Sequence, residues 1–77
     1  MSNQIADVIV HVDESLTRDQ LKTLEDRIHQ IAGVVSACNR ENQPHAISVT
    51  YDPSRIKALD ILTSVKRQGF HAELVGL

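Results

Sequence analysis

The sequence predicts an α+β fold in which two helices cover one face of a four-stranded sheet. Two observations lead to this prediction: apolar residues alternate with polar ones in short segments, and they recur at helical spacing in two longer segments. The length of 77 residues leaves room for one domain, residues 1–77. Its core must consist of Val, Ile, Leu and Ala, because Tyr51 and Phe70 are the only aromatic residues.

The first half of the chain predicts a strand, a helix and a second strand. Residues 6–12 alternate between apolar and polar side chains, as a strand with one buried face does. Thr17 and Gln20 have the spacing of a capping box, which begins a helix. Gly33 is expected to end this helix, and residues 34–38 form a short second strand. The apolar stripe of the helix consists of Leu21, Leu24, Ile28 and Ile31.

The second half predicts a turn, a strand, a helix and a last strand. Residues 39–44 are rich in turn formers and lead to a third strand at residues 46–51. A second helix ends before Gly69, and residues 70–75 form the fourth strand. The order β-α-β-β-α-β is that of a ferredoxin-like two-layer sandwich, with an antiparallel sheet in the strand order 4-1-3-2. The apolar stripe of the second helix consists of Leu59, Leu62 and Val65, helped by Ile61.

Composition excludes several classes of protein. Eight Lys and Arg against ten Asp and Glu give a net charge of −2, unlike the basic surface of a nucleic-acid binder. No apolar run approaches the roughly 20 residues that span a bilayer, and the first residues lack the apolar stretch of a signal peptide. Cys38 is the only cysteine, so no internal disulfide can form. We therefore expect a cytoplasmic protein that binds neither nucleic acid nor membrane.

Three short segments carry motifs that share an order and a spacing. Residues 28–34 read Ile-His-Gln-Ile-Ala-Gly-Val, residues 49–53 read Val-Thr-Tyr-Asp-Pro, and residues 68–74 read Gln-Gly-Phe-His-Ala-Glu-Leu. Together they resemble the heavy-metal-associated domain family, which includes copper chaperones and the N-terminal modules of metal-pumping ATPases. The resemblance covers residues 6–75 and implies a copper chaperone-like domain with a ferredoxin-like fold.

The resemblance also places the two metal-binding cysteines of that family at Thr17 and Gln20. Neutral hydroxyl and amide groups do not hold Cu(I) in competition with cellular thiols. The sequence is therefore interpreted as a divergent member that lacks the CxxC motif. Its favoured function is a non-enzymatic, protein-interaction or regulatory role near metal handling, which needs no cofactor.

Histidines provide the alternative function. The first and fourth strands are antiparallel neighbours in the predicted sheet, so His11 and His71 are expected side by side on the open face. Such a pair, with Glu73 as a third ligand, would bind Zn, Cu or Ni and make the chain a metal-binding domain or metallochaperone. His45 is expected at the same end of the sheet, leaning toward the helices. Solvated histidines without a metal are the structural alternative.

Several surface residues are candidates for contact with a partner. Ile9 is expected to be an exposed apolar residue on the open face. The strand at residues 34–38 is an edge without charged side chains, so it is poorly protected against pairing with another strand. A protein partner or a weak homodimer is expected at this edge or face. Phe70, Lys66 and Arg67 are further candidate contacts, although the two basic residues also suit a helix C-terminus.

An enzyme is the least favoured class. The sequence has no Gly-rich phosphate loop and no recognisable nucleophile–base pair. Cys38 is interpreted as an inert strand residue, because no His or Asn can be assigned as its base. Asp13 and Glu14 precede a helix, where the helix dipole favours negative charge, so they are not counted as catalytic carboxylates.

Overall fold

The computed structural model of the protein describes residues 4–40 and 43–75. The order of its elements confirms the predicted β-α-β-β-α-β arrangement. The elements are β1 (Ala6–Val12), α1 (Arg18–His29), β2 (Val34–Arg40), β3 (Gln43–Tyr51), α2 (Ala58–Arg67) and β4 (Ala72–Val75).

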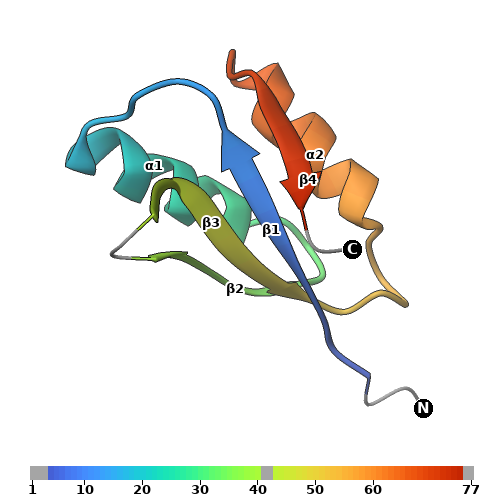
Figure 1. The fold of residues 1–77 in the computed structure, drawn as a ribbon. Coiled ribbons are helices and arrows are strands. Elements are labelled where there is room, and N and C mark those ends of the chain that lie inside the picture. Colours follow the sequence, from blue (N-terminus) through green and yellow to red (C-terminus); the bar gives the residue numbers. More distant parts are fainter. Residues whose placement is uncertain (1–3, 41–42, 76–77) are drawn as a thin grey trace.

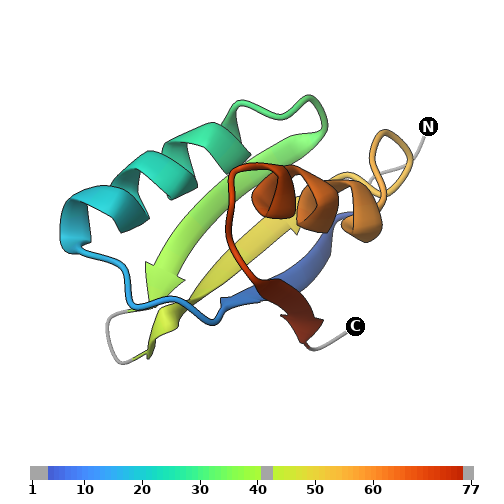
Figure 2. The ribbon, with the colours of Figure 1, turned by 90° about the horizontal axis from the view of Figure 1, so that it is seen from above.

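One antiparallel sheet holds all four strands in the order β2-β3-β1-β4, which is the predicted order counted from the other edge. Figure 1 shows β1 and β3 in the centre of this sheet. Figure 2 shows that α1 and α2 lie on the same face of it, so the molecule has two layers. The ferredoxin-like sandwich is therefore confirmed, with the second face of the sheet left uncovered by the described helices.

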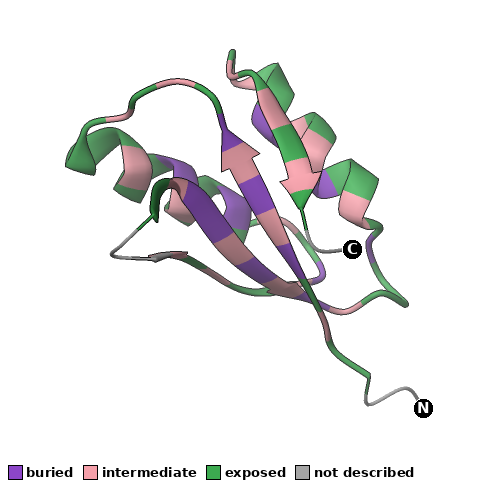
Figure 3. Ribbon diagram, in the orientation of Figure 1, coloured by how far each residue is buried: buried purple, intermediate pink, exposed green. Residues whose placement is uncertain are grey.

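The core lies between the helices and the sheet. Buried positions alternate along β1, and they follow helical spacing in α1, as Figure 3 shows. Each large apolar side chain removed from water in this way contributes about 1.5–3 kcal/mol. The side chains that are almost wholly buried are Val8, Val10, Val12, Leu24, Ile28, Ile47, Val49, Ile61 and Val65.

Gly33 does not end α1 itself, contrary to the prediction, because the helix ends at His29, but it ends the turn that follows the helix. Its φ of +97° lies in the left-handed region that side chains with a Cβ rarely adopt. A Cβ at this position would also lie 2.9 Å from the Cγ2 atom of Ile56, so only glycine fits. In the described part of the chain, no helix has the length and apolar character needed to cross a membrane.

The hairpin between β2 and β3 is tighter than predicted. β2 extends to Arg40 and β3 begins at Gln43, so most of the turn predicted at residues 39–44 is strand, and residues 41–42 lie outside the described residues. The Asn39 side-chain amide explains the difference, because it donates hydrogen bonds to the carbonyls of Gln43 and Ala46 at 3.0 and 2.9 Å. This turn-forming residue thus joins the two strands.

The apolar stripe predicted for α2 is confirmed at Val65 and Ile61 and wrong at Leu59 and Leu62. Leu59 is 66% exposed and Leu62 is only half-buried, whereas Ile61 and Val65 are fully buried. Ala58 packs beside these two and completes the inner face at a spacing of three and four residues. The sequence contains two overlapping apolar phases, and the packing of α2 against the sheet selects one of them.

β4 begins at Ala72 rather than at Phe70. The backbone carbonyl of His71 accepts a hydrogen bond from the Asp13 N–H at 2.8 Å, and the ladder with β1 starts only after this contact. Phe70 therefore lies in the turn before the strand and packs half-buried against the core. Ala72 and Leu74 share its side of the sheet, as the alternation predicts.

Candidate functional site

The start of α1, where the resemblance places a metal site, is a closed hydrogen-bonded cap. The Thr17 hydroxyl accepts a hydrogen bond from the Gln20 N–H at 3.1 Å, and the Gln20 side-chain oxygen accepts one from the Thr17 N–H at 2.9 Å. This reciprocal pair confirms the predicted capping box. Both oxygens are engaged by the backbone and neither is a soft ligand, so the residues present do not fit Cu(I).

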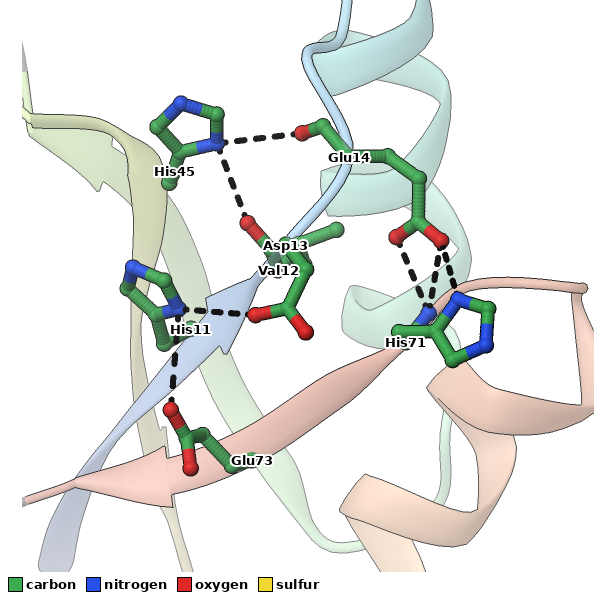
Figure 4. Close-up of polar contacts among 7 residues, drawn as sticks. All are labelled: His11, Val12, Asp13, Glu14, His45, His71 and Glu73. Carbon is green, nitrogen blue, oxygen red and sulfur yellow. Dashed lines mark hydrogen bonds and ion pairs between the residues drawn. The ribbon is translucent and has the colours of Figure 1, made fainter.

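A second polar cluster lies where β1 ends. His11 and Glu73 are directly opposite each other on β1 and β4, and Asp13 follows His11 by two residues. The Nδ1 atom of His11 lies 3.6 Å from Oδ1 of Asp13 and 4.0 Å from Oε1 of Glu73 (Figure 4). The candidate ligand atoms of all three residues lie within 4.8 Å of one another. Such a set of imidazole and carboxylate groups suits a divalent metal ion.

His45 from β3 lies beside His11, with the two ring centroids 5.9 Å apart and the rings inclined at 32°. The Nδ1 atom of His45 is 3.0 Å from the carbonyl oxygens of both Val12 and Glu14 (Figure 4). Because both partners are acceptors, this nitrogen carries the hydrogen and donates it. These contacts hold His45 at the end of β1, beside the His11 ring.

The predicted pairing of His11 with His71 is wrong. The register places Glu73 opposite His11, and His71 precedes β4. The Nδ1 atom of His71 lies 2.6 Å from a carboxylate oxygen of Glu14 instead. The two oxygens of that carboxylate also accept the backbone N–H of His71, at 2.9 and 3.0 Å. His71 therefore joins the loop after β1 to the turn before β4.

The contact between these two side chains shifts both of their pKa values. The side-chain hydrogen bond to Glu14, helped by the negative charge of Glu14, raises the pKa of His71. The same hydrogen bond lowers the pKa of Glu14. The pair thus favours a protonated imidazole next to an ionised carboxylate.

Asp13 and Glu14 are the site residues that the sequence analysis missed. Acidic residues are common before a helix because the helix dipole favours negative charge there, so the sequence gives no reason to assign them a second role. The available signal was the spacing of His11 and Asp13, because residues two apart on a strand share a face. Cys38, by contrast, is a free and exposed thiol on β2, away from this cluster in the strand order.

The predicted partner contacts lie on separate surfaces. Ile9 is half-buried rather than exposed, because it faces Val75 across the β1–β4 ladder and other strand neighbours flank it. Lys66 and Arg67 are exposed in the last turn of α2. Phe70 is half-buried against the core, and it lines a shallow groove beside α1.

The fold has close counterparts among solved structures. One is a copper binding domain from HMA7, a P-type ATPase, with 24% identity and a TM-score of 0.81 over 91% of this chain and 93% of that chain. Another is oxidized MerP from Ralstonia metallidurans CH34, with 14% identity and a TM-score of 0.83 over 95% of this chain and 100% of that chain. The chain shares their fold.

A third counterpart is the solution structure of the putative copper-ion-binding protein from Bacillus anthracis str. Ames. It is 19% identical, with a TM-score of 0.81 over 94% of this chain and 100% of that chain. No family model matches the sequence. No curated protein matches it either. The likeness to known proteins therefore lies in the three-dimensional arrangement of the chain.

Proposed function

We propose that this chain is a single-domain, non-enzymatic binding module of the heavy-metal-associated type, which has lost the thiolate site and acts through protein contact near metal handling. The observation that carries the proposal is the closed cap formed by Thr17 and Gln20. The likeness to a copper binding domain and a putative copper-ion-binding protein supports a role near metal handling.

The chemistry of the loop before α1 supports the loss of Cu(I) binding. Cu(I) prefers thiolate and thioether ligands, and residues 13–21 contain no Cys, His or Met. The side-chain oxygens of Thr17 and Gln20 already accept the backbone N–H groups at the helix start. A metal ion at this position would have to break the cap and would gain only neutral oxygen ligands.

The edge of the sheet supports the protein-contact role. β2 is an edge strand, and its Val35 side chain is 51% exposed. The segment from Val34 to Asn39 has no charged side chain that would oppose pairing with another strand. An extended segment of a partner, or a second copy of this chain, would add to the sheet here through backbone hydrogen bonds. The free Cys38 thiol on the same strand suits a reducing compartment such as the cytoplasm.

A Cu(I) titration in competition with a chelator tests the metal part of this function. The chain is expected to leave Cu(I) with the chelator, because it has no soft ligand pair. Retention of Cu(I) by the chain at stoichiometric ratio would contradict the proposal.

Sedimentation velocity over a range of concentrations tests the edge. We expect weak self-association that Val35→Lys removes, since the new charge on the edge opposes strand pairing. Leu59→Lys is the matched control, because Leu59 is an equally apolar, exposed side chain on α2. Association that is lost in the control and kept in Val35→Lys would place the contact on the helix layer.

A further inference from the structure

The cluster at the end of β1 is a separate site. We propose that His11, Asp13 and Glu73 bind one divalent ion of borderline softness, with Zn²⁺ as the test ion. The ligands are the Nδ1 atom of His11 and one oxygen of each carboxylate. Zn²⁺ binding here requires neither a partner at β2 nor the loss of Cu(I) binding at the start of α1.

An unpartnered nitrogen is the first observation behind this site. The Nδ1 atom of His11 is shielded from solvent and has no hydrogen-bond partner, although the His11 side chain as a whole is 41% exposed. No other buried side-chain nitrogen or oxygen among the described residues is in this state. The carboxylate oxygens at 3.6 and 4.0 Å are too far away for a hydrogen bond. Buried polar groups in proteins nearly always have a partner, so this nitrogen has a free position for a water molecule or an ion.

The spacing of the three groups is the second observation. Zn²⁺ binds imidazole nitrogen and carboxylate oxygen at about 2.0–2.2 Å, which places neighbouring ligands of a tetrahedral ion about 3.4 Å apart. The Nδ1 atom of His11 is 3.6 and 4.0 Å from its two carboxylate neighbours, slightly wider than this spacing. The ligand atoms of the three residues lie within 4.8 Å of one another, so the carboxylates must move closer to hold an ion. The Asp13 and Glu73 side chains are 64% and 71% exposed, which leaves them room to do so.

A direct ion pair does not explain this geometry equally well. A protonated imidazole and a carboxylate form a short, charge-assisted hydrogen bond at about 2.7–2.9 Å. His71 and Glu14 illustrate that case in the same molecule, at 2.6 Å. The Nδ1 atom of His11 lies 3.6 and 4.0 Å from two carboxylates, too far for a direct hydrogen bond to either. Ligands around a shared ion are arranged in this way.

The backbone holds the three ligands in place. His11 and Glu73 are opposite each other in the β1–β4 ladder, and the Asp13 N–H donates to the His71 carbonyl at 2.8 Å. The ring of His45 lies beside that of His11, with the two ring centroids 5.9 Å apart. Sites built on strands hold their ligands more precisely than sites on loops, and His11 and Glu73 are both strand residues.

The chemistry of the ligands indicates the class of ion. Two carboxylates balance the charge of a divalent ion, and the imidazole favours Zn²⁺, Cu²⁺ or Ni²⁺ over Mg²⁺ and Ca²⁺. The cluster contains no sulfur, so it does not favour Cu(I). Three protein ligands leave the fourth position of a tetrahedral ion open to water or to a ligand from a partner.

Zn²⁺ titration of the untagged full chain against a chromophoric chelator tests the site. One equivalent is expected to bind, and Asp13→Asn and Glu73→Gln should each weaken binding at least about tenfold, since even residues behind the ligands change metal affinity by 10–100-fold. Asp26→Asn is the matched control, because it alters an exposed carboxylate on α1 outside the cluster. The ¹⁵N resonance of the His11 Nδ1 atom should shift on addition of Zn²⁺.

The outcomes separate the possible origins of binding. Circular dichroism of each variant verifies that the exposed, isosteric changes leave the fold intact. The proposal is overturned if the parent shows no saturable binding of Zn²⁺, or if Asp13→Asn and Glu73→Gln bind as tightly as the Asp26→Asn control. It is also overturned if His71→Gln abolishes binding while the His11 resonance stays unchanged.

Discussion

The start of α1 and the end of β1 are joined by one short loop, yet their polar side chains differ in whether they form hydrogen bonds. At the helix start, Thr17 and Gln20 satisfy each other's backbone N–H groups. At the strand end, the Nδ1 atom of His11 stands apart from Asp13 and Glu73 with no hydrogen bond. A closed pair is explained by the stability of the fold, whereas the open cluster leaves one shielded nitrogen without a partner, which the proposed ion would supply.

Installing thiolates at the closed region should have the largest effect. The double change Thr17→Cys and Gln20→Cys replaces two hard oxygen groups with two soft ligands on a helix start that is already in place. Affinity for Cu(I), measured by chelator competition, is expected to rise by orders of magnitude over the parent. A folded double variant without this gain would show that the resemblance misplaces the metal loop.

Removing the cap should have a moderate effect on stability. Thr17→Ala deletes the acceptor of the Gln20 N–H and is expected to lower the free energy of unfolding by about 1 kcal/mol. Urea denaturation of the variant and the parent measures this change. Thr17→Ser is the control that keeps the hydroxyl and should retain most of the stability. Equal loss in both variants would argue against the hydrogen bond as the cause.

The contact between Glu14 and His71, which links the two regions, should make stability depend on pH. The raised pKa of His71 stabilises the fold at low pH, and this contribution is lost as pH rises through the raised value. The lowered pKa of Glu14 stabilises the fold above the ordinary carboxyl range, and this contribution is lost as pH falls through the lowered value. The pair therefore stabilises most between about pH 4.3 and 6.5, the ordinary pKa values of Glu and His.

Denaturation of the parent and of His71→Gln across this range measures that window. The stability difference between them should be greatest in mild acid and shrink toward alkaline pH. The negative charge of Asp13 also raises the pKa of His71. Asp13→Asn should therefore lower this pKa, so that the stabilisation by the pair is lost at a slightly lower pH. A stability difference that is constant with pH would mean that His71 acts through packing alone.

The smallest effect is expected for Glu73→Gln in the absence of metal. The Glu73 carboxylate is exposed and lies 4.0 Å from the His11 nitrogen, so its removal should change the free energy of unfolding by less than about 0.5 kcal/mol. Urea denaturation with a chelator present measures this value. A large loss would show that the open cluster contributes to the stability of the metal-free fold and would weaken its contrast with the cap.

Much of the fold could be predicted because its signals are local. The capping box at Thr17 and Gln20 involves residues three apart, and the alternation along residues 6–12 needs only the two-residue repeat of a strand. The strand order follows from the sequence of elements, since few topologies accommodate that order. These features do not depend on which residues of distant segments meet.

The site could be predicted only in part because it depends on register. The sequence indicates both His11 and Glu73 as candidate ligands. The choice between His71 and Glu73 as the residue opposite His11 depends on a shift of two residues along β4. Such a shift keeps every side chain on its face, so the apolar pattern does not exclude it. The position of Asp13 depends on a tertiary contact as well, because its N–H donates a hydrogen bond to the His71 carbonyl.

The sequence by itself determined the element order, the helix start and the absence of a thiolate pair, because these follow from residue types and their short-range spacing. Only the tertiary structure decided that Ile61 rather than Leu59 faces the core, and that Asp13 joins His11 and Glu73. Both outcomes depend on contacts between segments far apart in the chain. Packing of the helix on the sheet selects one apolar phase, and the hydrogen bond that closes the β1–β4 ladder selects one register.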